Sequence, residues 1–514
     1  MKNAQVAAGE WWREGVLYQI YPRSFADSNG DGIGDLPGVT SRLEYLEWLG
    51  IDGIWLNPTM PSPNADWGYD VADYCDVHPD LGTLADLDVL IGEADARGIR
   101  ILLDLVPNHT SDRHPWFADS RASRTSRRRD WYFWRDPKPD GSPPNNWLSV
   151  FGEGGPAWTL DEATGQMYLH HFLAEQPDLD WWSGEVRAAF DGVQRFWFDR
   201  GVAGFRIDVV SELVKQRELP DEGGDPEQFG KHADDAETHR VLKRWRRLAD
   251  SYDAPRLLLG ETWAMDAPTL ASFHGEANDE LNLAFNFPLM LAPLDAEIMV
   301  PVVEATEEIL LPEAWPVWTG SNHDFARFPT RWCQDDERKV RCALLLLLTL
   351  RGTPVLYYGD ELGLPQVEVT GEDVRDIAGR DGARTPMHWS GEAEAGFTEP
   401  GVKPWLPFGD FAARNVADQR GDPGSVLTFV RDLVAFRRES ADLRGGSYST
   451  VPGPDGTWAW RRGEGTTVAL NMSDKAAGVE VGTGTIRIAT DRGREGESVE
   501  GRLELAPWTG AVVS

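Results

Sequence analysis

The chain has 514 residues, enough for two or three domains, and its 41% hydrophobic and 11% aromatic content predicts a globular protein rather than a disordered one. Its formal net charge of −34 argues against nucleic acids and anionic membranes as partners, because both attract basic surfaces. The 23 tryptophans favour a sugar substrate, since aromatic faces stack on sugar rings, although large cores also use Trp.

The cysteine content predicts a reducing compartment. Cys75, Cys333 and Cys342 are too few for a disulfide framework, and none has the spacing of a zinc site. The first residues lack the apolar segment of a signal peptide, and no apolar stretch is long enough to span a bilayer. We therefore expect a soluble, cytoplasmic protein that acts on a small molecule as a monomer or a homodimer.

Short apolar runs typical of buried β-strands alternate with helix-like runs over most of the chain. The strands are expected at 16–22, 51–58, 100–108, 204–209, 256–263, 281–287, 315–320 and 354–360. Such alternation predicts a parallel sheet with crossover helices, and eight strands are the number that a closed (β/α)8 TIM barrel needs.

Apolar residues at helical spacing predict the helices between these strands. One apolar stripe covers 39–49 and ends at Gly50, two others end at Gly98 and Gly201, and 425–440 is expected to be the last barrel helix. A glycine at such a position supplies the left-handed residue that ends a helix.

Two regions depart from the strand–helix alternation. The long connection after the third strand is rich in Trp, Pro, Gly and Asp, and a structureless loop of that length is unusual in a compact domain. We predict a catalytic barrel made of 1–104 and 176–440, an inserted small domain at 105–175, and a C-terminal antiparallel β domain at 441–514 with Gly-rich turns.

Four of the predicted strands end in ionisable residues. The segments DLVPNH, GFRID, GETW and SNHD supply Asp104, His109, Arg206, Asp208, Glu261, His323 and Asp324. Catalytic groups at the C-terminal ends of different parallel strands are typical of TIM-barrel enzymes. Carboxylates with an arginine and no nucleophilic Ser or Cys motif predict glycosyl-transfer chemistry.

The spacing of these carboxylates predicts their roles. Arg206 and Asp208 lie two residues apart on one strand, so both point to the same side, and the arginine should lower the pKa of Asp208. Asp208 is the predicted nucleophile, Glu261 the general acid that later acts as base, and Asp324 the stabiliser of positive charge. Taken alone, the Arg206–Asp208 pair fits a buried ion pair equally well, and the four strand ends together favour catalysis.

The four segments, in this order, resemble the hallmark segments of the α-amylase superfamily, glycoside hydrolase family 13. The resemblance runs from Trp12 through the C-terminal β domain, and it implies a retaining mechanism with the three carboxylates in the roles above. It also implies a set of residues that bind the sugar, namely Asp66, Tyr69 as a stacking platform, His109, Arg206, His323 and Arg380.

Within that superfamily the chain is similar to the α-glucosidase and oligo-1,6-glucosidase group. Its QPDLDW segment resembles the group's QPDLN, with Asp180 in place of Asn. Its RDGARTPMHW segment resembles RDxxRxPMxW, which implies that Arg380 and Arg384 face the glucose sites. Enzymes of this group remove single glucose units from chain ends and prefer short substrates.

The segment DSNGDGIGD predicts a structural cation site. Its oxygen ligands at alternate positions are Asp27, Asn29, Asp31, the Ile33 carbonyl and Asp35. Gly32 stands where an EF-hand loop needs a tight turn, but the twelfth position is Gly38 and no EF-hand helix pair is apparent. The segment also resembles the metal loop of the group above. We expect Ca²⁺, with Mg²⁺ or an unoccupied Asp/Gly turn as alternatives, and no organic cofactor.

One residue bears on linkage preference. The residue after the nucleophile is Val209, and in this group Val is common in α-1,6-cleaving members, which implies isomaltose-type or mixed substrates. Asp180 and Trp263 depart from the oligo-1,6 pattern and are expected to alter the acceptor subsite.

The sequence thus predicts a retaining, exo-acting α-glucosidase that hydrolyses terminal non-reducing α-linked glucose from short substrates such as maltose, isomaltose or sucrose. Transglucosylation by the same residues stays open. The alternatives are a sucrose-isomerising or trehalose-forming glucosyltransferase, a phosphorylase, and a catalytically dead relative that serves as a transport or scaffolding subunit. The presence of all three carboxylates argues against the last.

Overall fold

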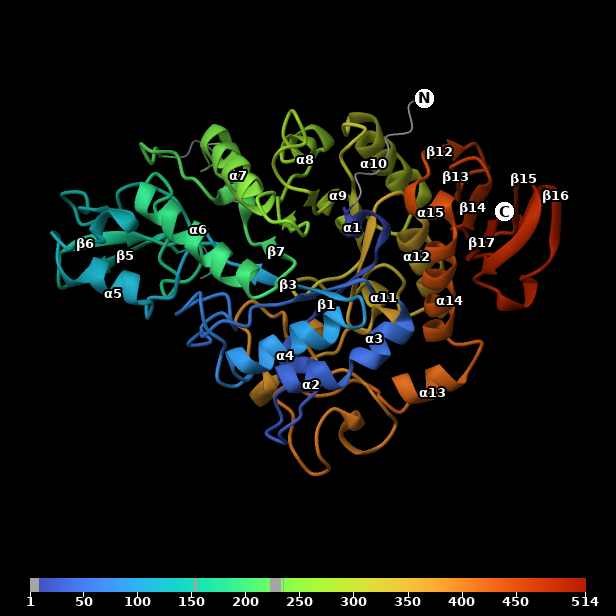
Figure 1. The fold of residues 1–514 in the computed structure, drawn as a ribbon, viewed down its shortest axis with the longest axis horizontal. Coiled ribbons are helices and arrows are strands. Elements are labelled where there is room, and N and C mark those ends of the chain that lie inside the picture. Colours follow the sequence, from blue (N-terminus) through green and yellow to red (C-terminus); the bar gives the residue numbers. More distant parts are fainter. Residues whose placement is uncertain (1–8, 152–154, 222–232, 234) are drawn as a thin grey trace.

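The computed structural model describes residues 9–151, 155–221, 233 and 235–514. Its centre is a parallel sheet with the strand order β10-β11-β1-β2-β3-β7-β8-β9, which Figure 1 shows surrounded by helices. The strands are β1 (Leu17–Ile20), β2 (Gly53–Leu56), β3 (Arg100–Leu105), β7 (Gly204–Ile207), β8 (Leu257–Gly260), β9 (Leu283–Ala284), β10 (Val317–Thr319) and β11 (Thr353–Tyr357). A parallel bridge between Phe285 and Val317 joins β9 to β10 and closes the barrel. The predicted (β/α)8 fold is confirmed.

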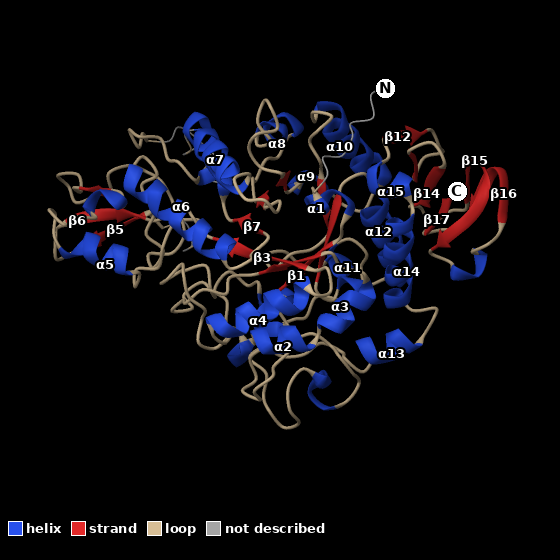
Figure 2. Cartoon of the chain, in the orientation of Figure 1, coloured by secondary structure: helices blue, strands red, loops and turns tan. Residues whose placement is uncertain are grey.

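Helices cover the outside of the barrel, as Figure 2 shows in blue. They are α1 (Trp11–Glu14), α2 (Leu36–Ser41), α3 (Leu43–Leu49), α4 (Leu84–Asp95), α6 (Gly184–Asp199), α7 (Asp235–Ala249), α8 (Ala267–Ser272), α9 (Phe287–Leu291), α10 (Ala296–Ile309), α11 (Phe328–Arg331), α12 (Glu337–Thr349), α13 (Val416–Gly421), α14 (Val426–Glu439) and α15 (Ala441–Gly445). Their apolar faces pack on buried strands, so the barrel and its helices share one core.

The prediction of a single helix over 39–49 is wrong, because two helices, α2 and α3, occupy this region. The break between α2 and α3 falls at Arg42, whose backbone leaves the helical region at φ −105° and ψ 6°. The Arg42 guanidinium stacks on Trp389 and donates to the Gly396 carbonyl. A tertiary contact thus fixes a break that the apolar pattern does not reveal.

A small sheet lies between β3 and α6. Its strands are β4 (Trp134–Arg135), β5 (Trp158–Asp161) and β6 (Gln166–Leu169) in the order β4-β6-β5, and helix α5 (Pro115–Ala122) precedes them. The sheet has a core of its own that includes Phe133, Trp147 and Trp158. Figure 1 shows it on the opposite side of the barrel from the C-terminal sheet.

The C-terminal sheet is antiparallel with the order β12-β13-β14-β17-β15-β16. Its strands are β12 (Tyr448–Val451), β13 (Thr457–Arg462), β14 (Thr466–Asn471), β15 (Ala477–Ala489), β16 (Ser498–Leu505) and β17 (Thr509–Val513). The apolar runs of the sequence indicate neither β12 nor β17. They indicate only part of β15, because glycines and an irregularity between Glu480 and Gly482 interrupt its pattern.

Within the described residues, none of the helices has both the length and the apolar content that crossing a membrane requires. All three cysteines are free, and Cys333 and Cys342 are buried.

Candidate active site

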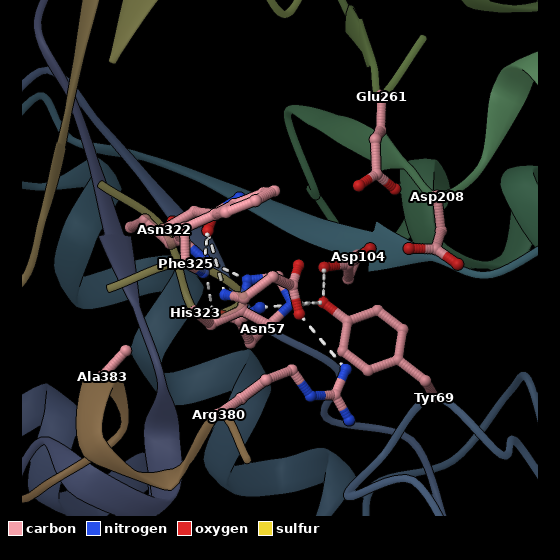
Figure 3. A network of polar contacts seen from close by, with 12 residues as sticks. Asn57, Tyr69, Asp104, Asp208, Glu261, Asn322, His323, Phe325, Arg380 and Ala383 are labelled. Atoms are coloured by element: carbon pink, nitrogen blue, oxygen red, sulfur yellow. Dashed lines mark hydrogen bonds and ion pairs between the residues drawn. The ribbon is translucent and has the colours of Figure 1, made fainter. Parts of the chain in front are cut away.

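A cavity of about 270 Å³ opens at the C-terminal ends of the barrel strands. Its lining residues are Asp66, Tyr69, His109, Val150, Phe151, Phe172, Asp208, Val209, Glu261, Trp263, His323, Asp324, Phe325, Ala378 and Arg380. The three predicted catalytic carboxylates therefore share one cavity, and Figure 3 shows Asp208 and Glu261 pointing into the same space. Cavities of this kind, with few convergent polar groups, are typical small-molecule sites.

One guanidinium holds three carboxylates at the floor of this cavity. Nη1 of Arg206 lies 2.5 Å from Oδ1 of Asp208 and 2.9 Å from Oδ1 of Asp104, and Nη2 lies 2.8 Å from Oε2 of Glu261. Arg206 itself is 1% exposed and lies beneath the cavity rather than in its wall. The shared guanidinium keeps Asp208 and Glu261 close together, as a retaining pair of carboxyl groups requires.

The electrostatics of this group differ from the prediction for Asp208. Arg206 does lower the pKa of Asp208, but burial raises it more, and the charges on Glu261 and Asp104 add to the increase. Burial likewise raises the pKa of Asp104 to about 6. Both raised pKa values have the same physical cause, because one guanidinium does not offset the burial of the negative charges around it.

The backbone around Val209 positions Glu261. The Val209 N–H donates to Oε2 of Glu261 at 3.0 Å, and the Glu261 carbonyl accepts from the Val210 N–H at 2.9 Å. Val209 adopts φ 46° and ψ 47°, a left-handed conformation that is costly for a β-branched residue. The strained turn therefore brings both an N–H donor and the Val209 side chain to the reacting groups.

Asp324 is held in its ionised form from three sides. Burial would raise its pKa, but His323, Arg380 and Arg384 outweigh burial and hold it well below its usual range. The Arg380 and Arg384 guanidinium groups lie 3.2 Å and 3.4 Å from Oδ1 of Asp324. A permanently ionised carboxylate suits the stabilisation of a positively charged transition state.

Arg384 was expected to face the sugar, and the structure places it elsewhere. It is fully buried, does not line the cavity, and donates from Nε to the His323 carbonyl at 2.9 Å. Arg384 therefore positions His323 and Asp324 from behind. Arg380, in contrast, lies in the cavity wall, where it contacts Asp66 as well as Asp324.

The hydroxyl of Tyr69 connects several site residues, as Figure 3 shows. It accepts from the Asn57 amide at 2.9 Å and donates to Asp104 at 3.0 Å. Nε2 of His323 lies 2.5 Å from the same hydroxyl, and its Nδ1 faces the Gln19 amide. Burial holds the pKa of His323 well below its usual range, so the ring is neutral and donates through Nε2. The Tyr69 ring, stacked on His323, faces the cavity.

A second network supports His109 from the QPDLDW segment, which directly follows the predicted inserted domain. The Gln176 amide reaches both Asp66 and Nε2 of His109 at 3.0 Å. Burial lowers the pKa of His109 to about 4 and keeps it neutral. Behind His109, the buried Asp178 carboxylate accepts from Lys215 and contacts His171, and these groups tie the inserted segment to the barrel.

These supporting residues were not identified from the sequence. Gln176 and Asp178 belong to the QPDLDW segment, so the segment signalled them without revealing what they contact. No sequence motif pointed to Lys215 or to Asp376. The Asp376 carboxylate binds Arg380 through both of its oxygens. Lys215 is far from its partner Asp178 in the chain, so only folding brings that pair together, whereas Asp376 lies four residues before Arg380.

The side of the cavity beyond Glu261 is aromatic. Trp263 stacks on Phe287 with 4.5 Å between ring centroids and 13° between planes, and Phe325 lies 6.0 Å from Trp263. Trp263 therefore lines the cavity, and its effect on an acceptor subsite stays a prediction. Asp180 does not, because it lies outside the cavity wall and accepts from the Trp182 N–H at 2.9 Å.

The loop between β1 and α2 is closed by its own side chains. Asp27 accepts from the N–H groups of Asn29, Gly30 and Gly32, and the Asp35 side chain caps α2 at Gly38. A Cβ atom on Gly38 would lie 1.9 Å from the Ala26 carbonyl oxygen, so the twelfth position has no room for an EF-hand Glu.

The donor set of this loop fits a hard cation in type, because its donors are all oxygen atoms. Among the described residues, however, no group of three or more His, Cys, Asp or Glu side chains gathers as a metal site. A cation here would depend on Asn29, the Ile33 carbonyl and water as well as carboxylates. The loop does not contribute to the cavity wall, so its role would be structural.

Comparisons with known proteins give a consistent result. The family model described as "Alpha amylase, catalytic domain" matches residues 19–446. The chain is 39% identical to a probable alpha-glucosidase of Rhizobium meliloti (strain 1021), with 97% of this chain and 96% of the relative covered. It is 38% identical to an oligo-1,6-glucosidase of Heyndrickxia coagulans, with 90% and 92% covered.

Two solved structures are similar over almost their full lengths. The alpha-glucosyl transfer enzyme XgtA has a TM-score of 0.90 and 39% identity, and the alignment covers 98% of this chain and 99% of that one. The isomaltulose synthase SmuA from Protaminobacter rubrum has a TM-score of 0.92 and 32% identity, with 99% of each chain covered.

Proposed function

The chain belongs to the α-amylase family, and from the geometry of its cavity we infer that it is a retaining, exo-acting α-glucosidase. The observation that carries this proposal is the single Arg206 guanidinium that holds Asp208 and Glu261 together at the cavity floor. Its substrates are short oligosaccharides and disaccharides with a terminal, non-reducing α-linked glucose. The family membership and the glucosidases among the relatives support this assignment.

In the proposed reaction, the glucose ring binds against Tyr69 with its hydroxyl groups near Asp66, His109, His323 and Arg380. Glu261 protonates the glycosidic oxygen while Asp208 attacks the anomeric carbon and forms a covalent glucosyl–enzyme ester. Asp324 stabilises the positive charge that develops on the ring.

In the second step, the ionised Glu261 takes a proton from water, whose oxygen attacks the anomeric carbon and releases Asp208. The product keeps the α configuration. An acceptor hydroxyl in place of water gives transglucosylation with the same residues.

The second candidate function is glucosyl transfer or sucrose isomerisation, as the names of two similar structures indicate for those proteins. The stacked pair of Trp263 and Phe287 favours it, because an acceptor held by aromatic rings beside Glu261 competes with water. The Val209 side chain, which lines the cavity, is proposed to favour α-1,6 linkages.

Initial rates on equal concentrations of maltose, isomaltose and sucrose, with products separated by chromatography, test these proposals. Free glucose as the main product supports hydrolysis, and isomaltose as the fastest substrate supports the role given to Val209. New disaccharides as the main product support the transferase instead. Absence of turnover on all three would contradict the glucosidase assignment.

We also propose that the 27–35 loop binds Ca²⁺, with Mg²⁺ as the alternative. The alternating oxygen donors support this proposal, and calorimetric titration of chelator-treated protein with CaCl₂ and MgCl₂ tests it. Heat of binding in neither titration would contradict it.

A further inference from the structure

A second pocket of about 440 Å³, called the outer pocket below, lies next to the catalytic cavity. Its walls come from three parts of the chain, within residues 23–33, 64–80 and 375–405. Among the described residues, no side chain lines both the outer pocket and the catalytic cavity. The two are neighbours because Asp66 lines the catalytic cavity and the next residue, Trp67, lines the outer pocket.

Two tryptophan rings shape the outer pocket. The Trp67 and Trp405 rings lie 5.2 Å apart between centroids with 51° between their planes, so they form a wedge rather than a stack. Both side chains are half-buried, which leaves part of each ring open to a ligand. Trp405 stacks on Tyr21 with 5.8 Å between centroids and 7° between planes, and its Nε1 donates to the Ser24 hydroxyl at 2.9 Å. The Trp405 ring is therefore ordered before any ligand binds, which lowers the entropic cost of binding.

The Trp67 ring is held in the outer pocket by a strained backbone. Trp67 has φ 48°, in the left-handed region that residues with bulky side chains rarely adopt. Its Nε1 donates to the Arg375 carbonyl at 3.2 Å, so a contact with a distant segment keeps the ring in place. Backbone strain of this kind is concentrated at binding and catalytic sites, and it favours a binding role for this ring.

The charged groups of the outer pocket already have partners. Arg23 lies 3.0 Å from Asp80, and Lys403 lies 3.0 Å from Asp373, so an anion would have to displace existing ion pairs. A cation would meet the positive charges of Arg23, Arg375 and Lys403 in the same wall. The outer pocket therefore favours a neutral ligand over either kind of ion.

A neutral ring with several hydroxyl groups fits this combination of side chains. The apolar face of a pyranose ring stacks on an indole, as Trp67 and Trp405 allow. Its hydroxyl groups can accept from the Arg375 guanidinium and donate to the oxygen atoms of Asn64 and Asp80. A ligand without hydroxyl groups would displace water from these polar groups and give nothing in return.

We propose that the outer pocket is a second, non-catalytic binding site for neutral oligosaccharides of α-linked glucose. That it binds a neutral sugar follows from its own side chains, whereas the choice of α-linked glucose rests on the proposed glucosidase function. Asp208 and Glu261 do not line it, so a bound chain is not cleaved there. The site instead holds a substrate chain one residue away from the wall of the catalytic cavity.

α-Cyclodextrin distinguishes the outer pocket from the catalytic cavity. It is a closed ring of α-1,4-linked glucose units, so it has no terminal glucose for an exo-acting cavity to accept. The full chain is titrated with it by calorimetry in buffer that contains CaCl₂, so that the 27–35 loop beside the pocket is in one state throughout. We expect saturable binding with a Kd of about 1 mM, because each ring is only partly open to the ligand.

Two variants assign the binding to the outer pocket. Trp67→Ala should weaken the binding of α-cyclodextrin about tenfold, since the stacking face is lost, and Trp67→Phe should retain most of it. Arg375→Gln should weaken it several-fold, and because Arg375 is exposed, this change leaves the packing of both rings intact. Thermal unfolding of each variant shows whether it is folded at the temperature of the titration.

Trp48→Ala is the control for the loss of a tryptophan. Trp48 is half-buried like Trp67, and each ring has an arginine guanidinium nearby, Arg420 at 4.6 Å from Trp48 and Arg23 at 5.7 Å from Trp67. Trp48 lines neither the outer pocket nor the catalytic cavity. Its removal should leave the Kd for α-cyclodextrin unchanged.

The outcomes separate this proposal from the proposed function. If α-cyclodextrin does not bind to the unmodified enzyme, the outer pocket is not a site for α-linked glucose. If it binds equally well to Trp67→Ala and Arg375→Gln, the sugar site lies elsewhere and the proposal is overturned. If maltose, isomaltose and sucrose release no glucose while α-cyclodextrin still binds through Trp67, the glucosidase function fails and the second site stands.

Discussion

Two regions of this molecule bury arginine in opposite ways. At the cavity floor, Arg206 faces three carboxylates. At the interface between the barrel and the C-terminal sheet, the fully buried Arg437 and Arg462 bind main-chain carbonyl groups at the end of α12.

The pKa values follow this difference. Burial alone would lower the pKa of Arg206, but Asp104, Glu261 and the other nearby anions raise it well above its usual value. At the interface burial prevails, and it lowers the pKa of Arg437 to about 10 and that of Arg462 as well. Carbonyl dipoles at a helix C-terminus stabilise a cation but do not neutralise it.

The buried arginines at the interface are expected to contribute to stability, and Arg206 at the cavity floor to function. At the interface, each guanidinium joins elements that must pack together, so its removal should weaken the fold. At the cavity floor, carboxylates outnumber the cation, which costs stability and raises the pKa values of Asp208 and Asp104. Functional sites often contain such uncompensated charges.

The largest expected effect is on turnover at the cavity floor. Asp208→Asn and Glu261→Gln should each lower kcat by roughly 10³-fold or more, because nucleophilic attack and proton transfer then lack their groups. The melting temperature should stay the same or rise, since each change removes one buried charge from an overfilled group. Steady-state kinetics and thermal unfolding measure both quantities, and near-normal turnover in either variant would refute the roles.

The second-largest expected effect is a loss of stability at the interface between the barrel and the C-terminal sheet. Arg462→Met leaves the carbonyls of Thr349, Leu443 and Gly446 without their donor, and it should lower the free energy of unfolding by about 2 kcal/mol. Because the interface is separate from the cavity, kcat per folded molecule should not change. Arg461→Met is the control, since Arg461 is exposed on the same strand. Equal unfolding temperatures for the two variants would contradict the structural role.

The sequence could predict that three carboxylates meet at one site, because each carboxylate has a local signal. Each lies a few residues after a buried apolar run, so strand prediction and residue type together place Asp208, Glu261 and Asp324 at one end of the barrel. Their convergence in one cavity follows from the parallel barrel. The strained conformation of Val209 has no local signal, because it comes from the packing of the turn.

Several contacts that support the site join distant segments, and the sequence does not reveal them. Lys215 and Asp178 are 37 positions apart and Trp263 and Phe287 are 24 apart, and neither pair follows a helical or strand period. For Arg384 the sequence suggested a contact with the sugar that the structure does not show. Its motif resembles a sugar-binding segment, but its side chain is buried behind His323. Strand β17 was missed because it is short and completes its ladder only through β14 and β15.

The pH dependence distinguishes the carboxylate group from an ordinary ion pair. Asp208 must be ionised to attack, so activity falls as the pH drops through its raised pKa. Asp104→Asn removes a neighbouring negative charge that raises this pKa, so the acid limb of kcat/KM should move to lower pH by about one unit.

The control is Asp180→Asn, a change of the same chemistry at a half-buried residue outside the cavity wall. The kcat/KM of this control variant should fall at the same acidic pH as that of the unmodified enzyme. If kcat/KM of Asp104→Asn falls at the same pH as in the unmodified enzyme, or at a higher pH, the proposed effect of the Asp104 charge on the pKa of Asp208 is wrong.

The smallest expected effect concerns the 27–35 loop, whose carboxylates accept from nearby backbone N–H groups. If the loop binds Ca²⁺, a free concentration about ten times Kd should add about 1.4 kcal/mol to the free energy of unfolding, because only the folded loop presents its oxygen donors together. Thermal unfolding with EDTA and with excess CaCl₂ should then differ by a few degrees, while kcat at 25 °C stays constant because the loop does not line the cavity.

Asp31→Asn tests the same point without a chelator. The Asp31 side chain is exposed and accepts only the nearby Ile33 N–H within the loop, so its loss should abolish the response to calcium with little other damage. A calcium response that is unchanged in Asp31→Asn would place the cation elsewhere. If kcat also falls when the cation is chelated, the loop must affect the cavity indirectly, through its packing on the barrel. The carboxylates bound to Arg206, in contrast, act within the cavity itself.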